Sequence, residues 1–491
     1  MNEIYLPEVD DQGVPWCAES CPAHDGKRCE ILGRKPDAIC EPAVAGMARG
    51  AGAGGVAMIR EIHIIGGGTV SHVRPHLALC APAYGGTARR LAEIAGELDL
   101  GGGDHAVLLH LTRMADGGER GLETNEDLAM RLAELVARPE THMVFMTAAV
   151  CDFEGGLDGE EPGTAPLERA RLVSWDRWED APMRHTLRLS PAEKLVSRIR
   201  AERKDIFLAA CKTTTGKSAD EMFEAGLRLL KRAHCNLVLV NDLHTGWNMV
   251  VTPEQARYAV TEDRAEALRA LVGMAKERSA GTFVRTTVMP GPAVPLADPR
   301  VPASLREVVG KLVEAGAYRE FDGKTVGHYG CRLSAEEFLF SRRGRNYNES
   351  TDMVRCRVTP GGVVAVGGKP SAGAATQRRL FEDHPGYDCV AHFHCPLSPH
   401  GGREVPRRPQ RGLECGSLEC GENTSEGMAE LEPGVKVVYL EQHGPNVLWD
   451  SRKASWGEVW RLVEKEFDLR ATTRDEAEAE LEKAETEADG E

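Results

Sequence analysis

Between residue 59 and about residue 280, short apolar runs alternate with longer stretches in which apolar residues recur at helical spacing. The runs that predict buried strands are Glu61–Ile65, Ala106–Leu111, His142–Val150, Asp205–Cys211 and Asn236–Val240. The stretches that predict helices are Gly85–Leu98, Asn125–Ala137 and Ser218–Ala233. Strands that alternate with helices in this way are typical of a Rossmann-like parallel α/β sheet.

Polar residues gather where these predicted strands end. Gly66, Gly67 and Gly68 follow the first strand, Asp152 follows the third, and Asn241 follows the fifth. Parallel sheets bind ligands at the edge formed by the carboxyl ends of their strands, and a glycine turn lets backbone N–H groups approach a phosphate. The pattern therefore predicts a ligand site at this edge. The alternative is that the polar side chains only cap strands and anchor turns.

Two later apolar runs, Tyr387–Ala391 and Val435–Leu440, each predict a buried strand that ends close to histidines. Because side chains alternate along a strand, His392 and His394 project to the same side. With His443 from the other strand end, they would offer three nitrogen donors and leave one position open, as a catalytic zinc requires. The alternative is that each histidine forms hydrogen bonds in a core, and the spacing alone favours neither interpretation.

The first 58 residues form a predicted module of their own, which ends in a linker rich in Gly and Ala. Four cysteines occur in it at a density that suits a structural zinc or an iron–sulfur cluster. The alternative is an N-terminal leader in which these thiols are incidental. The four residues are Cys17, Cys21, Cys29 and Cys40.

Length and charge narrow the classes of function. A chain of 491 residues is too long for one ordinary core, so two or three domains are expected. The formal net charge of -16 disfavours general binding to nucleic acid polymers or membrane surfaces. No apolar run approaches the length of a membrane span, and the first residues lack a signal-peptide pattern, so we expect a cytoplasmic protein.

The stretch from Glu61 to Ser279 contains Gly66–Thr69, Ala148–Phe153, Leu189–Pro191 with the later Lys194, Lys212–Thr215, the helix around Arg228 and Val240–Asp242. In their order and spacing these segments resemble phosphopantothenate cysteine ligase. The resemblance implies an enzyme that activates a carboxylate with CTP or ATP and Mg²⁺ and couples it to an amine. The chain departs from the family at Pro82–Gly86, in place of its Asn-x-Ser-Ser-Gly loop, and at Thr214, in place of a Glu.

The same resemblance assigns roles to individual residues. Asp152 would contact the base or ribose of the nucleotide, while Pro191 and Lys194 would shape its pocket. Lys212 begins the segment similar to the family's Lys-x-Glu-Thr and is a candidate catalytic residue. Arg228 or, alternatively, Lys231 would face the triphosphate, where cations offset the charge that develops on the phosphates.

From about Ala303 to Phe467 the chain resembles the class II aldolase and adducin family. Gly327–Arg332 is similar to that family's phosphate loop, with His328 in place of its Asn, and Pro370-Ser371 is similar to its Pro-Ser-Ser-Glu. The zinc ligands that this resemblance implies are His392, His394 and His443.

The family's catalytic Glu is missing from the expected place. It lies nineteen residues before the first histidine of the family, and the corresponding residue here is Gly373. The proton-transfer residue is therefore open, and we consider Tyr329 and Glu382 as the candidates.

The sequence predicts an α/β protein with a Rossmann-like parallel sheet domain, a class II aldolase-like α/β/α domain and a small Cys-rich N-terminal module. Pro-rich residues 281–302 predict a linker, and residues 469–491 an acidic tail. The expected segments are 1–58 for the module, 59–280 for the ligase-like domain, 281–302, 303–468 for the aldolase-like domain, and 469–491.

The expected function is that of a two-domain enzyme for a phosphorylated or carboxylated small molecule. A nucleotide-dependent ligase-like domain would be joined to a zinc-dependent aldolase-, epimerase- or dehydratase-like domain. One alternative is a divergent ligase whose aldolase-like part is a non-catalytic scaffold, as in adducin. Another is a regulatory protein that binds a nucleotide without consuming it. Both resembled families form homo-oligomers, so a homo-oligomer is expected.

Overall fold

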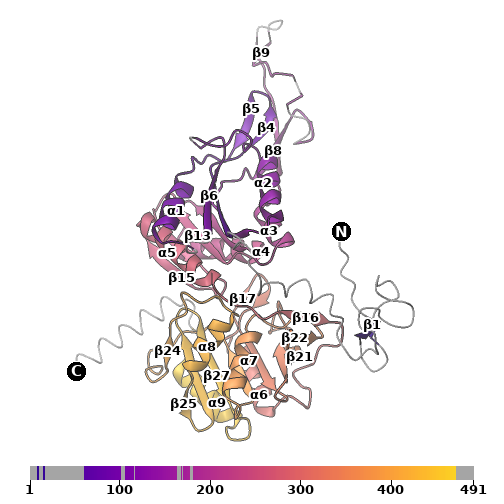
Figure 1. The fold of residues 1–491 in the computed structure, drawn as a ribbon, viewed down its shortest axis with the longest axis vertical. Helices are drawn as coiled ribbons and strands as arrows, with labels where there is room; N and C mark the ends of the chain where they lie inside the picture. The colour runs from indigo at the N-terminus through magenta and orange to yellow at the C-terminus, as the bar shows by residue number, and fades with distance from the viewer. Residues whose placement is uncertain are drawn as a thin grey trace, which may run out of the picture. The chain divides into compact units, whose positions relative to one another are not determined.

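A computed structural model of the chain describes residues 60–100, 105–115, 117–162, 167–168, 170–176 and 181–470, with the short strands β1 (Glu8–Val9) and β2 (Pro15–Trp16) (Figure 1). Contacts divide the chain into two units, Met1–Met58 and Ile59–Glu491. The metal or cluster site predicted at the N-terminal cysteines lies outside the described residues, as does most of the predicted acidic tail. The cysteines concerned are Cys17, Cys21, Cys29 and Cys40.

The first sheet of the second unit has seven strands in the order β15-β14-β13-β12-β7-β3-β6. Its parallel strands are β3 (Arg60–Gly66), β6 (His105–Leu111), β7 (Thr141–Met146), β12 (Phe207–Thr214) and β13 (Leu237–Asp242). Two antiparallel strands, β14 (Asn248–Val251) and β15 (Arg257–Thr261), extend it on one side. The expected Rossmann-like parallel sheet is confirmed.

Helices cover both faces of this sheet. Alternate residues of a strand enter opposite cores, so Met143 and Phe145 join one cluster while Val144 and Met146 join the other. Because both faces exclude water, the strands read as nearly continuous apolar runs. The helices are α1 (Gly86–Glu97) and α5 (Arg264–Ser279) on one face, and α2 (Asn125–Ala137), α3 (Val196–Glu202) and α4 (Ala219–Ala233) on the other.

Short antiparallel strand pairs also belong to this domain. The pair β8–β11 bears on function because it begins directly after Asp152 and ends at Pro191. The pairs are β4 (Val70–Arg74) with β5 (Leu77–Cys80), β8 (Phe153–Leu157) with β11 (Leu187–Pro191), and β9 (Trp175–Asp176) with β10 (Ala181–Pro182).

The second sheet has ten strands, most of them antiparallel, in the order β16-β22-β21-β20-β19-β23-β27-β26-β24, with β25 beside β26. The strands are β16 (Thr286–Met289), β19 (His328–Arg332), β20 (Glu337–Ser341), β21 (Met353–Thr359), β22 (Gly362–Val366), β23 (Cys389–His392), β24 (Arg407–Arg408), β25 (Ala429–Glu432), β26 (Val435–Leu440) and β27 (Gly444–Trp449). A separate hairpin pairs β17 (Glu320–Phe321) with β18 (Lys324–Thr325).

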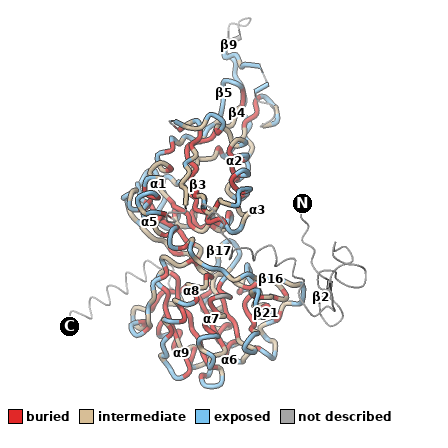
Figure 2. Tube along the Cα trace, in the orientation of Figure 1, coloured by how far each residue is buried: buried red, intermediate tan, exposed pale blue. Residues whose placement is uncertain are grey.

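Two helix pairs enclose this second sheet, which confirms the expected α/β/α layering. α6 (Ala303–Glu314) and α9 (Trp456–Glu466) pack over the core that contains Tyr329. α7 (Ala374–Asp383) borders the opposite core and packs against α8 (Leu418–Glu426). Figure 2 shows buried residues along the central strands of both sheets and exposed residues on the outer sides of the helices.

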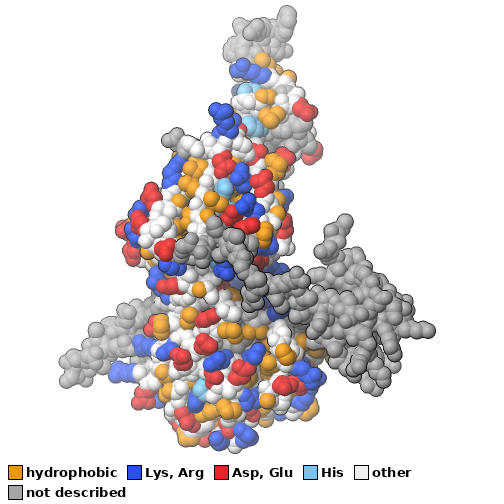
Figure 3. Space-filling view, viewed as in Figure 1, with side chains coloured by type: hydrophobic (Ala, Val, Ile, Leu, Met, Phe, Trp, Pro, Cys, Tyr) orange, Lys and Arg blue, Asp and Glu red, His pale blue; other side chains and the backbone are white. Residues whose placement is uncertain are grey.

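Part of the stretch expected to be a linker belongs to the second sheet. Residues Thr286–Met289 form β16 and pair in parallel with β22, and Val294 exchanges backbone hydrogen bonds with Met353. The prolines in this stretch therefore flank a strand at the sheet edge, a position that proline tolerates. Within the described residues, no helix has the length and apolar character of a membrane span. On the face shown in Figure 3, acidic and basic side chains are interspersed.

Candidate functional site

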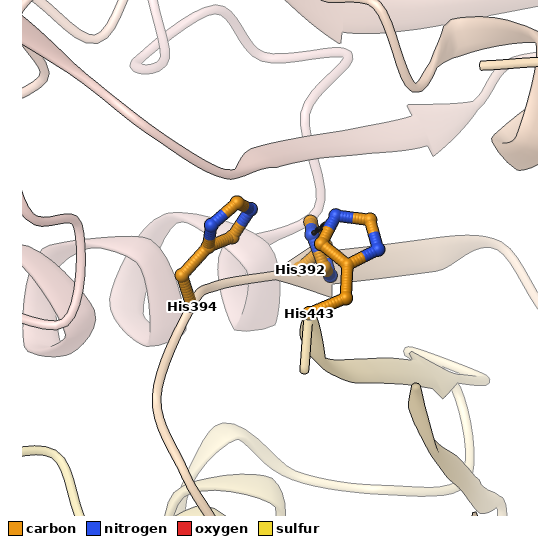
Figure 4. A group of neighbouring side chains, drawn as sticks. All are labelled: His392, His394 and His443. Atoms are coloured by element: carbon orange, nitrogen blue, oxygen red, sulfur yellow. Dashed lines mark hydrogen bonds between the residues drawn. The ribbon is translucent and has the colours of Figure 1, made fainter. Parts of the chain in front are cut away.

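Three histidines meet where β23 ends beside the start of its neighbour β27 (Figure 4). His392 is the last residue of β23, and His394 follows two residues later. His443 lies in the tight turn that joins β26 to β27. In this turn Gly444 has a φ of 132°, and a Cβ on it would lie 2.3 Å from the carbonyl oxygen of Phe393. Glycine therefore lets the turn pass close to the segment that carries the other two histidines.

The distances between the three imidazoles suit one bound ion. One ring nitrogen from each histidine lies within 4.8 Å of the others, and the side chains are buried or nearly so. The Nε2 atoms of His392 and His443 are 3.2 Å apart. Two nitrogens that each lie about 2.0–2.1 Å from a tetrahedral ion are separated by about 3.3 Å. The donor set and spacing therefore fit a divalent metal with a vacant fourth position.

The ring of His392 is held in the orientation that a ligand needs. Its Nδ1 is 2.7 Å from the carbonyl oxygen of Pro445, and because a carbonyl only accepts, Nδ1 carries the proton. The lone pair is then on Nε2, which faces His443. A backbone carbonyl bonded to the far nitrogen is the usual support of a metal-binding imidazole.

A buried polar network surrounds His392. His328 and Asn446 are its partners on the neighbouring strands β19 and β27, so all three side chains lie on the same sheet face. From α7, the amide nitrogen of Gln377 reaches both His328 Nε2 at 2.5 Å and Asn446 Oδ1 at 3.3 Å. Sequence patterns did not point to Gln377 or Asn446. The available signal was a glutamine at a buried position of an amphipathic helix.

The His328 ring packs directly against Gly373. The imidazole of His328 packs at a centroid distance of 4.6 Å from that of His392. A Cβ on Gly373 would lie 2.2 Å from His328 Cε1, so the ring occupies the volume that a side chain at 373 would need. Burial, and then the neighbouring His392, lower the pKa of His328 well below its usual range. His328 is therefore a neutral imidazole.

The structure does not bring the two candidate proton carriers to the histidines. Tyr329 follows His328 in β19 and points to the opposite core, where its ring lies 6.0 Å from that of Tyr318 and 5.2 Å from that of Tyr347. Burial raises the pKa of Tyr329 far above its usual value. Glu382 pairs with Arg378 at 2.7 Å, near the end of α7. At 1.5 Å rise per residue, that is about 14 Å along the helix from residue 373.

A thiol that the sequence analysis did not single out lies beside the histidines. Cys415 Sγ is 4.0 Å from His443 Nε2. Cys415 does not join the three-histidine group, in which every ligand atom is within 4.8 Å of every other. The thiol therefore lies at the border of the centre rather than among its donors.

In the parallel sheet, the glycine turn is explained by close packing. A Cβ on Gly67 would lie 2.1 Å from Thr112 Oγ1, and one on Gly68 would lie 2.0 Å from the carbonyl oxygen of Ala81. Gly67 also has a φ of 96°. Only glycine fits this path of the chain at the end of β3.

The turn is tied to the segment that carries Asp152. Thr69 Oγ1 accepts a hydrogen bond from the backbone N–H of Cys151 at 2.8 Å and donates one to Asn125 Oδ1 at 2.6 Å. The carbonyl oxygen of Asp152 accepts a hydrogen bond from Ala192 N, and its carboxylate lies 2.5 Å from Lys194 Nζ. The structure thus brings the glycine turn, Asp152, Pro191 and Lys194 to one edge. Thr69 and Asn125 act in this assembly without having been predicted to do so.

Lys212 and Asn241 lie on adjacent strands towards the same edge. Thr213 of β12 pairs with Asn241 of β13, and the Thr213 hydroxyl is 3.3 Å from Asn241 Oδ1. The next residue, Asp242, is buried and accepts backbone hydrogen bonds from Gly216 and Lys217. Although its burial acts to raise the pKa, the hydrogen bonds to Asp242 hold the pKa well below its usual range. Asp242 therefore shapes the turns of this edge.

The structure separates Arg228 and Lys231 from this edge. α4 begins at the edge next to its N-cap Ser218 and runs back along the sheet, so Arg228 lies about 15 Å along the helix from the cap. Lys231 donates a hydrogen bond to the carbonyl oxygen of Pro253 at 2.8 Å, and burial lowers its pKa. Neither cation faces the glycine turn.

Solved structures similar to parts of the chain come from two groups. A DNA/pantothenate metabolism flavoprotein from Streptococcus pneumoniae is 19% identical, with 44% of this chain and 98% of that chain covered and a TM-score of 0.34. The C-terminal domain of a coenzyme A biosynthesis bifunctional protein is 13% identical, with coverages of 43% and 91% and a TM-score of 0.32. L-fuculose 1-phosphate aldolase is 19% identical, with coverages of 38% and 98% and a TM-score of 0.24.

A family model matches one segment in the C-terminal half of the chain. Residues 310–462 match the Class II Aldolase and Adducin N-terminal domain, whereas no curated protein matches the chain. The matched residues include all three clustered histidines together with His328, Gly373 and Gln377. Both resemblances expected from the sequence are thus found. Residues 310–462 are thus similar to the class II aldolase and adducin family, and the solved structures similar to parts of the chain include a DNA/pantothenate metabolism flavoprotein.

Proposed function

We propose that the C-terminal domain is a metal-dependent enzyme domain that acts on a carbonyl group of a phosphorylated or carboxylated small molecule. The observation that carries this proposal is the cluster of three imidazole nitrogens within 4.8 Å, with His392 already oriented by Pro445. His392, His394 and His443 would hold the metal, for which zinc is the candidate. Such an ion, when bound, supplies a Lewis acid that polarises a carbonyl oxygen.

The residues around the histidines have separate tasks in this proposal. Pro445 fixes the tautomer of His392, while Gln377 holds the side chains on both sides of His392 in place. Burial excludes bulk water and strengthens the electrostatic interactions of any charge that develops at the open position. No proton carrier of the chain is assigned, because Tyr329 and Glu382 lie elsewhere.

The parallel-sheet domain is proposed to bind CTP or ATP with Mg²⁺ and to couple a carboxylate to an amine. Support comes from one edge that unites the glycine turn, Asp152, Pro191, Lys194 and, on adjacent strands, Lys212 and Asn241. Release of pyrophosphate or phosphate across a panel of acids and amines tests this. We expect turnover to fall in the Lys194→Ala variant. Nucleotide binding without turnover would favour a regulatory protein.

Metal content tests the main proposal. We expect the full-length protein to hold about one more metal ion per chain than its His392→Ala variant, because removal of one of three ligands weakens the site strongly. His384→Ala is the matched control, since His384 is half-buried at the end of α7 and bonds to Ser425. Equal metal content in the wild type and His392→Ala would favour the alternative of a non-catalytic scaffold domain.

A further inference from the structure

The glycine at position 373 is required by space and not by backbone conformation. Gly373 has a φ of -70°, which any residue adopts, and it caps the start of α7. The Cβ of any other residue would lie between 2.2 and 2.8 Å from three atoms of the His328 ring. A carboxylate side chain at 373 is therefore incompatible with the imidazole of His328 in its present position.

The imidazole that fills this space is held by a buried amide. Gln377 is fully buried, and its amide nitrogen contacts His328 Nε2 at 2.5 Å and Asn446 Oδ1 at 3.3 Å. These contacts fix the His328 ring beside His392.

The charge of the centre follows from its donors. The three ligand candidates are imidazoles, and no Asp or Glu oxygen joins the group among the residues that the structure describes. A divalent ion held by neutral donors keeps its full charge, which is the largest local charge in such a site. In a buried site this charge attracts an anion far more strongly than a neutral oxygen.

We propose that the open position of this centre binds a carboxylate, so that the substrate is a small hydroxy or keto acid. Because the His328 ring fills the space beside Gly373, no side chain at position 373 can supply a carboxylate to the centre. This inference rests on the proposed metal site.

The melting temperatures of single and double variants test, independently of any metal, whether the His328 ring occupies the space that a side chain at 373 would need. Gly373→Ala is expected to lower the melting temperature by several degrees, because its Cβ overlaps the His328 ring. In a His328→Asn background, Gly373→Ala should lower the melting temperature far less, since the shorter Asn side chain leaves room for the Cβ at 373. Gly310→Ala is the control, because nothing lies within 4 Å of a Cβ there. If Gly373→Ala lowers the melting temperature equally in both backgrounds, the His328 ring does not occupy the space needed at 373.

Two probes of similar size, one an anion and the other neutral, test the ligand. In the cobalt-substituted full-length protein, glycolate is expected to shift the visible spectrum with an affinity at least about tenfold above that of glycolamide. The double variant His328→Asn/Gly373→Glu introduces a carboxylate and should reduce that preference, whereas Cys415→Ser should retain it. Equal affinities for the two probes in the wild type overturn the proposal.

The outcomes separate this inference from the proposed function. If the wild type takes up no cobalt, the metal site itself fails, and the proposed carboxylate ligand fails with it. If cobalt binds but glycolate shows no preference over glycolamide, the metal site stands and only the carboxylate ligand is wrong. In either case, the melting temperatures of the Gly373 and His328 variants show whether the His328 ring excludes a side chain at 373.

Discussion

At the scale of single residues, two glycines shape the histidine centre for different reasons. Gly444 is needed because its φ of 132° and the carbonyl of Phe393 leave no room for a side chain. Gly373 is needed because His328 occupies its side-chain volume. The first sets the distance between His443 and the other two histidines, and the second determines which groups can lie beside them.

We expect Gly444→Ala to destabilise the protein by at least about 1–3 kcal/mol, the cost of a strained backbone position, with the steric overlap added. Because the turn places His443, metal content should fall as well. Thermal unfolding and metal analysis of the same sample measure both effects. Gly310→Ala, in the middle of α6, is the control and should be neutral or slightly stabilising. An unchanged melting temperature in Gly444→Ala would refute the packing argument.

The three histidines could be predicted from the sequence because strand alternation puts His392 and His394 on one side. The contact between the His328 ring and Gly373 could not be predicted, since it links a strand to the start of a helix that is distant in sequence. Gln377 shares a helix face with Leu380 and Phe381, which indicates burial, but the sequence does not show which groups its amide contacts. Tyr329 was a candidate because of its loop, yet strand alternation turns it to the opposite core from His328.

At the scale of elements, the carboxyl ends of parallel strands form the edge at which a nucleotide is proposed to bind, and turn residues stabilise this edge. Asp242 ends β13 and accepts backbone hydrogen bonds from Gly216, Lys217, His244 and Thr245. Sequence patterns placed Gly66–Gly68, Asp152 and Asn241 at this edge correctly. They could not show that α4 carries Arg228 away from it, because that depends on the direction of the helix.

We expect Asp242→Ala to lower the melting temperature by several degrees, since the four backbone N–H groups lose their acceptor. The pKa of Asp242 is lowered in the folded protein, so its contribution to stability is fully present above the ordinary carboxyl pKa of about 4. This contribution is lost as the pH falls towards the folded-state pKa. The difference in stability between wild type and variant should therefore shrink in acid, and a difference that grows on acidification would contradict this role.

At the scale of the whole molecule, two sheets of different type lie in sequence along the chain. Hydrophobic periodicity was sufficient for the parallel sheet, because its strands are continuous apolar runs. It was less informative for the antiparallel sheet, where the family resemblance carried most of the prediction. The Pro-rich stretch was expected to be a linker, yet β16 pairs with β22 through backbone hydrogen bonds that composition does not reveal. The predicted homo-oligomer is open to a direct measurement of mass in solution.

X-ray absorption at the metal edge of the zinc-loaded full-length protein and of its His392→Ala variant tests the central claim most directly. In the wild type we predict a first shell with three imidazole nitrogens at about 2.0–2.1 Å and one further light atom, without sulfur, and loss of this pattern in the variant. Absence of the imidazole pattern, or a sulfur in the first shell that disappears in Cys415→Ser, would contradict a centre built from His392, His394 and His443 alone.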